Sequence, residues 1–235
     1  MKHKFRFVQK ILFAVSCLIA LSALAGPVYA EGTWQAQKES GCKVWNSNPE
    51  MDATFTWTGG CKDGYLDGAG TLQWFEAGAP GDKYIGQYSR GRPHGRGIFV
   101  WAFPSARYEG DFINGQRSGK GIQDFANGDR YEGDWSEDQP NGKGSYVWVN
   151  EDQYRGDFAV GKAHGRGVKI WADGTRYEGD FVNGQPQGKG VQTWVKGARY
   201  EGDFVNGQMH GFGVITLRDD RVFRGKWENN NYIGP

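Results

Sequence analysis

The sequence is poor in the residues that build reactive sites. Of its 235 residues only three are cysteine and four are histidine, and no Cys-x-x-Cys pair appears, so a zinc site of the usual spacing is not expected. Basic and acidic residues nearly balance, at 28 and 27, which argues against the strongly basic face that nucleic-acid binding needs. The composition therefore points away from metalloproteins and from DNA- or RNA-binding proteins.

Catalytic motifs are missing as well. No Ser/His/Asp or Cys/His set stands out, and the stretch GQRSGKG from Gly115 differs from a phosphate-binding loop in its spacing and in the glycine after its lysine. His94, His164 and His210 occupy the same position in different repeat units, which on a stacked sheet lie about 19 Å or more apart. We interpret them as surface loop residues, and the sequence predicts no enzyme, no cofactor and no metal site.

Long apolar runs are confined to the first thirty residues. This segment starts with four basic residues, continues with an apolar run over residues 11–25 and ends with Val28-Tyr29-Ala30, which is the layout of a secretory signal peptide cut after Ala30. The run of about 15 residues is shorter than the about 20 that a membrane span needs, although an uncleaved anchor is the alternative. We predict a periplasmic or secreted protein.

Export has two consequences. The signal segment carries four of the basic residues and no acidic one, so the mature chain is slightly acidic. Cys42 and Cys61 remain in a compartment where thiols oxidise, which favours one disulfide over a metal or redox role. By loop-entropy reasoning this bond would stabilise the fold by about 3 kcal/mol.

Glycine and aromatic residues are abundant and periodic. The chain has 38 glycines, 10 tryptophans, 11 tyrosines and 14 phenylalanines, and the glycine content is about twice the usual share. An aromatic residue opens each of eight units, and from Tyr108 onward the period is 23 residues: Trp57, Tyr84, Tyr108, Tyr131, Tyr154, Tyr177, Tyr200 and Phe223. Such a period indicates an array of stacked units.

Each unit reads as a β-hairpin, as in YEGDFVNGQPQGKGVQTW over residues 177–194. Tyr177 and Phe181 alternate with polar residues as in a strand, and a second Gly-flanked strand follows Asn-Gly. Three units carry proline two residues after this Asn-Gly position: Pro93, Pro140 and Pro186. Because proline donates no ladder hydrogen bond, we predict a longer loop in which Phe181 faces Gly188 and Asp180 faces Lys189.

This register has consequences for both faces of the sheet. On one face it predicts ion pairs within each hairpin, which would stabilise it by about 0.2–1 kcal/mol each: Asp111–Lys120, Asp134–Lys143, Asp157–Arg166 and Asp180–Lys189, with Asp203 left opposite Phe212. On the other face, one glycine per unit leaves a hollow over which neighbouring rings can lie: Gly110, Gly133, Gly156, Gly179 and Gly202. We therefore interpret the residues that recur in each unit as those that pack one hairpin against the next.

The units YEGDFINGQRSGKG, YEGDWSEDQPNGKG and YEGDFVNGQMHGFG, which start at Tyr108, Tyr131 and Tyr200, resemble MORN repeats. The resemblance covers roughly residues 55–235. Within the family, the chain is similar to an exported bacterial MORN repeat protein. It implies an all-β fold, an elongated single-layer antiparallel sheet of stacked hairpins, and a binding or scaffolding role without a catalytic residue. Some members contact membranes, and others grip an extended partner segment in an aromatic-lined groove.

Three regions follow from these features: a signal peptide at 1–30, a capping segment at 31–54, and an array of about eight units at 55–235. The first unit departs from the pattern, since Cys61 replaces its second aromatic, and we expect Cys42 to pin the capping segment over the open sheet edge. Asp138 replaces a loop glycine and Arg155 replaces the usual acid. The last unit is partial.

The aromatic rings are the candidate site. They are either only a packing layer or also a partner-binding groove, because a single-layer sheet leaves one face without a covering layer; the candidate residues are Tyr84, Tyr108, Phe112, Tyr131, Trp135, Tyr154, Phe158, Tyr177, Phe181, Tyr200 and Phe204. We predict a protein partner, with a membrane lipid headgroup or a glycan as the alternative, and no nucleic acid. The oligomeric state stays open.

Overall fold

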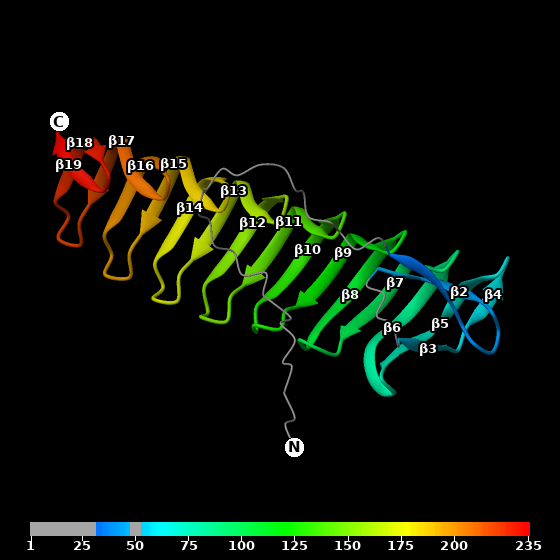
Figure 1. Cartoon of the computed structure of the whole chain (residues 1–235). Helices are drawn as coiled ribbons and strands as arrows, with labels where there is room; N and C mark the ends of the chain where they lie inside the picture. Colours follow the sequence, from blue (N-terminus) through cyan, green and yellow to red (C-terminus); the bar gives the residue numbers. More distant parts are fainter. Residues whose placement is uncertain (1–31, 48–52) are drawn as a thin grey trace, which may run out of the picture.

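The computed structural model describes residues 32–47 and 53–235, and the predicted signal peptide lies outside this part of the chain. The described residues form one open sheet of 19 strands without a helix, so none of them belongs to a helix that is long and apolar enough to cross a membrane. Successive hairpins follow one another along a line from β5 to β19 (Figure 1). The predicted all-β class and the single antiparallel sheet of stacked hairpins are confirmed.

The strands fall into two groups. Four short strands lie at the first end: β1 (Thr33–Ala36), β2 (Lys43–Asn46), β3 (Thr54–Trp57) and β4 (Gly60–Lys62). The array consists of β5 (Tyr65–Glu76), β6 (Ala79–Ser89), β7 (Arg92–Trp101), β8 (Ala106–Ile113), β9 (Gln116–Asp124), β10 (Arg130–Ser136), β11 (Gln139–Val147), β12 (Gln153–Ala159), β13 (Lys162–Ile170), β14 (Arg176–Val182), β15 (Gln185–Thr193), β16 (Arg199–Val205), β17 (Gln208–Thr216), β18 (Val222–Glu228) and β19 (Asn231–Gly234).

The hairpin β14–β15 shows how a unit is built. Asn183 and Gly184 form a two-residue turn with φ values of 50° and 87°, which is the left-handed geometry that fits the twist of the flanking strands and that Asn-Gly adopts readily. Val182 and Gln185 close the hairpin. The Asn-Gly pair therefore sets the register of the whole unit.

The predicted longer loop is wrong. Phe181 pairs with Pro186 within the hairpin, not with Gly188. In a two-residue hairpin the pair next to the closing pair is not hydrogen-bonded, so the nitrogen of Pro186 points outward and the hairpin loses no bond. The carbonyl of Pro186 accepts a hydrogen bond of 2.9 Å from the N–H of Gly207 in the next turn, which ties successive turns together.

A β-bulge in the return strand separates the turn from the glycine pair Gly179–Gly190. Gly188 has a φ of 67°, a left-handed conformation that favours glycine at a bulge. The carboxylate of Asp180 accepts the N–H of Lys189 at 3.3 Å. Asp180 thus contacts the backbone N–H of Lys189, whereas the sequence predicted an ion pair with the Lys189 side chain.

The ion pairs join neighbouring hairpins instead. The predicted pairs Asp111–Lys120, Asp134–Lys143, Asp157–Arg166 and Asp180–Lys189 are wrong, because the bulge brings each base opposite the acid of the following unit. The observed pairs are Arg96–Asp111 at 3.9 Å, Lys120–Asp134 at 2.5 Å, Lys143–Asp157 at 2.5 Å, Arg166–Asp180 at 3.2 Å and Lys189–Asp203 at 2.6 Å. Asp203 therefore has a partner, and Phe212 donates only its backbone N–H to it, at 3.1 Å.

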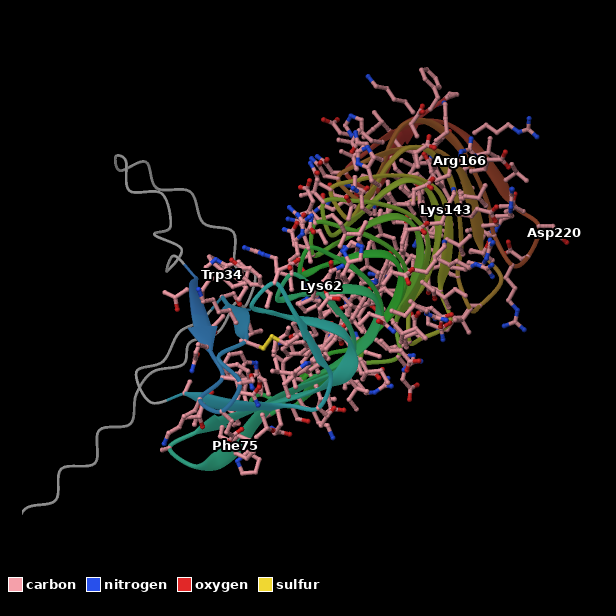
Figure 2. The ribbon with its side chains drawn as sticks, turned by 90° about the vertical axis from the view of Figure 1, so that its right-hand side faces the viewer. Trp34, Lys62, Phe75, Lys143, Arg166 and Asp220 are labelled. Atoms are coloured by element: carbon pink, nitrogen blue, oxygen red, sulfur yellow. A yellow bond between two sulfur atoms is a disulfide. The ribbon has the colours of Figure 1, made fainter. Side chains whose placement is uncertain are left out.

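The short strands occupy the first edge of the array. Strands β3 and β4 pair with different halves of β5, and the hairpin β1–β2 lies against β5 and the β6–β7 turn through the N–H groups of Lys43 and Trp45, which bond to Gly64 and Gly91 at 2.9 Å. A disulfide joins Cys42 to Cys61 with a Cα separation of 6.0 Å and is visible as the yellow bond in Figure 2. The predicted disulfide is present.

Candidate functional site

The six tyrosines that open the units from Tyr84 to Tyr200 lie flat over glycine pairs. A Cβ on Gly179 would come within 2.5 Å of the Tyr177 hydroxyl, and a Cβ on Gly190 would come within 2.4 Å of the Tyr177 ring. The Tyr177 hydroxyl also donates a hydrogen bond of 3.0 Å to the carbonyl of Asp180. The predicted role of the glycines as hollows for rings is confirmed.

The rings interlock from one unit to the next. The ring centroid of Tyr177 lies 5.1 Å from that of Phe181 in its own unit and 4.8 Å from that of Phe204 in the next unit. Both pairs are edge to face, a geometry that aromatic rings favour. Equivalent contacts continue from Tyr84 to Trp227. We call the side of the sheet that carries these rings the aromatic face.

The eleven rings of the candidate site are brought together in this one layer. All of them are buried, with exposed fractions of 6% or less: Tyr84, Tyr108, Phe112, Tyr131, Trp135, Tyr154, Phe158, Tyr177, Phe181, Tyr200 and Phe204. A partner needs accessible side-chain surface, and these rings offer almost none. Their burial favours the packing alternative over the aromatic groove.

A further row of aromatic residues, absent from the candidate site, is partly exposed at the other end of the strands. We call it the tryptophan stripe: Trp101, Phe125, Trp148, Trp171 and Trp194. These residues pack against the edge of the buried layer. Their own spacing of 23 or 24 residues is the signal that could have identified them from the sequence.

Two cations pack on aromatic rings of this face. The Lys169 ammonium lies 4.9 Å from the ring of Trp148 and 5.2 Å from that of Trp171, and it pairs with Asp152 at 3.6 Å. The Arg117 guanidinium lies 4.5 Å from the ring of Trp135. Such contacts are favourable when partly desolvated, so both cations are already engaged within the protein.

The opposite face carries an open groove across the strands. It consists of two adjoining segments of about 630 Å³ and about 980 Å³. Its floor is the backbone of the glycine pairs with one small or apolar side chain per hairpin: Ile122, Ser145, Val168, Val191 and Val214. Looking along the array, Figure 2 shows the strands as nested arcs, from β5 to the C-terminal hairpins. We call this feature the groove.

One wall of the groove consists of the bases that join neighbouring hairpins. The side chains of Lys120, Lys143 and Lys189 are each 72% exposed although each contacts an aspartate. An ammonium has three donors, and each of these lysines contacts one carboxylate in the described residues. Up to Lys189 the wall therefore presents unused cationic donors once per hairpin, whereas Phe212 takes this position in the next hairpin.

The second wall is acidic in most units but not in all. Glu109, Glu132, Glu178 and Glu201 line it, whereas Arg155 stands at the same position in the unit between them and Arg224 at the same position in the last unit. In the described part of the chain Glu178 pairs with Arg176, but Arg155 has no acidic side chain within ion-pair distance and is exposed. Arg155 is a cation available to a ligand in the middle of the groove.

The two faces also differ in their titration. On the groove face, the hydrogen bond from the Lys143 ammonium lowers the pKa of Asp157 below its ordinary value. On the aromatic face, burial raises the pKa of Tyr200 to about 12 and raises the pKa of the other unit tyrosines further. These shifts stabilise ionised carboxylates on one face and neutral phenols on the other.

The residues described by the structure contain no group of three or more histidine, cysteine, aspartate or glutamate side chains that could hold a metal ion. His94, His164 and His210 lie on β7, β13 and β17, which belong to separate hairpins as the repeat spacing predicts, but they are strand residues and their predicted place in loops is wrong. The accessible chemistry of the surface is thus that of a groove with cationic, acidic and apolar rows.

Distant likenesses are found among solved structures. The TCP domain of Drosophila Melanogaster SAS-4 (dCPAP), in complex with a proline-rich motif of Ana2 (dSTIL), aligns at 10% identity and a TM-score of 0.37, covering 89% of this chain and 99% of that one. The TCP10 domain of Danio rerio CPAP aligns at 14% identity and a TM-score of 0.37, covering 74% and 89%. TM-scores this low carry no argument about this protein. No curated protein matches the sequence.

The repeat itself matches a family model. Six consecutive MORN repeats are found, at residues 84–102, 108–130, 131–153, 154–176, 177–199 and 200–220. They start at the six unit tyrosines that lie over the glycine pairs; the divergent units at Trp57 and Phe223 are outside the match. The matched repeats span more than half of the chain, and the protein belongs to the MORN repeat family.

Proposed function

We propose that this protein is an exported, non-catalytic scaffold of the bacterial cell envelope that binds an extended segment of a protein partner in the groove. The binding surface is then the face opposite to the eleven rings of the sequence-based candidate site. The rings hold the hairpins in line, and the groove carries recognition.

The observation that carries this proposal is the contrast in accessibility between the faces. The groove runs across the strands of successive hairpins from Arg96 to Gly225, while the rings behind it are buried. An elongated groove with one floor residue per hairpin suits a ligand that is itself a linear chain. Repeat arrays commonly use extended surfaces of this kind for binding.

Crosslinking pull-down with matched variants tests the proposal. Val168→Asp and Val191→Asp together place charge on the groove floor, and Val195→Asp places it at an exposed loop outside the groove. We expect an envelope partner to be lost with the double floor variant and retained with wild type and the loop variant. All three proteins should have similar circular dichroism spectra. Equal recovery by all three would exclude the groove as the binding surface.

Export and capping belong to the same proposal. N-terminal sequencing of the mature protein should read from Glu31, because we infer cleavage after Ala30. We infer that residues 31–54 cap the array, since β1–β4 occupy its first edge, and an open edge of this length would invite strand pairing with other chains. An intact N-terminus in the exported protein would overturn the cleavage site.

The tryptophan stripe favours a second candidate function, binding of a glycan or a lipid headgroup. Partly exposed indole rings at regular spacing suit stacking on sugar rings or contact with a membrane interface. Glycan-array and liposome binding would decide, with Trp171→Ala and Trp194→Ala compared with the floor variants. Binding that depends on the tryptophans and not on Val168 or Val191 supports this alternative.

A further inference from the structure

The spacing of the hairpins constrains the shape of a ligand in the groove. Each hairpin contributes two strands, and strands lie about 4.7–4.9 Å apart, so equivalent positions recur about every 9.5 Å along the groove. The floor residues Ser145, Val168 and Val191 come from successive hairpins at this interval. A ligand that makes the same contact with each hairpin must repeat at the same distance.

Only one regular extended peptide conformation meets this condition. A polyproline II helix rises about 3.1 Å per residue with three residues per turn, or about 9.3 Å per turn. A β-strand repeats its facing every two residues, at about 6.6–6.8 Å, so it would lose register within two hairpins. The polyproline II helix presents one side chain per turn to the floor of each hairpin.

The wall lysines complement the backbone of such a ligand. A polyproline II segment has no internal hydrogen bonds, so all of its carbonyl groups seek donors. Lys120 and Lys143 lie on successive hairpins, each with donors left after contacting its aspartate. One cationic donor per hairpin therefore meets one turn of the ligand.

Charge complementarity fixes a position along the ligand. Arg155 interrupts the acidic wall, lies between Ser145 and Val168 in the cross-strand row, and makes no ion pair within the described residues. The neighbouring positions in the wall, Glu132 and Glu178, would repel a ligand carboxylate. An acidic ligand residue is therefore favoured opposite Arg155 and disfavoured one turn away on either side.

We propose that the groove binds a protein segment in the polyproline II conformation, with an apolar residue at every third position and an acidic residue at the position facing Arg155. This inference rests on the proposed function and specifies the conformation, period and charge of its ligand. Its prediction is that period and charge placement, more than composition, decide affinity.

Fluorescence anisotropy with the mature chain and synthetic peptides tests it. The probe carries valine at every third position and proline elsewhere, with one proline between the two central valines replaced by glutamate, because Arg155 lies between the floor residues Ser145 and Val168; the comparison peptide has the same composition with the valines placed irregularly. We expect the periodic peptide to bind at least about tenfold more tightly. Equal affinity of the two peptides would overturn the inference and leave the groove intact as a binding surface.

A charge swap tests the role of Arg155. Arg155→Glu should weaken binding of the glutamate peptide by about tenfold or more, and a peptide with lysine in place of that glutamate should recover affinity for the variant. Arg218→Glu, at an exposed loop position that does not line the groove, serves as the matched control. Equal weakening by both variants, or no recovery with the lysine peptide, would contradict the assignment.

The two proposals fail in different ways. If no periodic peptide binds but crosslinking to the partner still depends on Val168 and Val191, the polyproline II inference is overturned and the proposed function stands. If the partner is retained by the floor variants as well, the groove is not the site and both are overturned.

Discussion

On the aromatic face, six successive hairpins each place a tyrosine with at most 1% exposure over a pair of glycines. On the groove face, the row that contains Glu132 changes to Arg155 in the next unit and returns to Glu178 in the one after. The first face repeats strictly because one ring fits one hollow, and any change meets backbone atoms. The second faces solvent, so substitutions there cost little and are free to specify a ligand. Strict repetition within this array therefore indicates packing, and departures from it indicate recognition.

The largest expected difference between the faces comes from adjacent residues. Gly179→Val places a side chain within 2.6 Å of backbone atoms of Gly190 and Lys189 and against the Tyr177 hydroxyl, so we expect loss of the folded array. Glu178→Val, one residue earlier on the groove face, should change stability by no more than about 0.5 kcal/mol. Circular dichroism melts of the two variants decide, and similar melts would contradict the packing scheme.

Alkaline unfolding should follow from the aromatic face alone. The folded-state pKa of Tyr200, about 12, exceeds the unfolded value of about 10, so the stability from neutral tyrosines is fully present below pH 10. It is lost as pH rises toward 12, because the unfolded chain ionises first. We expect phenolate absorbance of these tyrosines to appear together with loss of the β-sheet signal; ionisation in a still folded protein would show that the rings are accessible.

A smaller effect is expected from one ring of the aromatic face. Phe181→Ala removes a side chain that is 1% exposed and contacts Tyr154 and Tyr177, and such deletions cost about 3–5 kcal/mol. Val182→Ala, the next residue, which is 43% exposed, should cost about 0.5 kcal/mol or less. Urea unfolding measures both, and equal midpoints would remove the distinction between the faces.

The smallest effect is expected on the groove face, from the Lys143–Asp157 pair. Lys143→Met should cost at most about 1 kcal/mol at neutral pH, since exposed ion pairs contribute little, and should raise the pKa of Asp157 toward about 3.9. The lowered pKa of Asp157 gives stability that is present above the unfolded value and lost as pH falls through the folded one. Wild type and variant should thus converge once the pH falls below the folded-state pKa of Asp157, and an NMR titration that leaves the Asp157 pKa unchanged would contradict this coupling.

The period of the sequence was enough to predict the fold and the buried layer. Tyr177 and Gly179 alternate with polar residues as in a strand, and the glycine leaves room for one ring. Hairpins, stacking and the ring-over-glycine contact therefore all follow from short-range rules. The register did not follow, because the objection to Pro186 assumed a bond inside the hairpin that its geometry does not require. The bulge at Gly188 then moved every ion pair to the next unit.

The candidate site was less predictable than the fold. Sequence reasoning placed recognition on the aromatic residues because one face of a single-layer sheet has no second layer, but edge-to-face contacts such as Tyr177–Phe204 close the rings off from solvent. The position of the groove depends on the face of the sheet at which the backbone of the glycine pairs is left uncovered. This is a property of the whole bent sheet and not of any one unit. Arg155 was visible as a departure from the pattern, yet only the cross-strand row places it in a groove.

Peptide titration followed by NMR tests most directly the claim that the groove face binds while the aromatic face packs. The indole N–H signals of Trp148, Trp171 and Trp194 report on the aromatic side, and the methyl signals of Val168, Val191 and Val214 report on the groove floor. With the periodic glutamate peptide, the account predicts shifts of the three valines and unchanged indoles. Shifts confined to the tryptophans, with the valines unaffected, would contradict it.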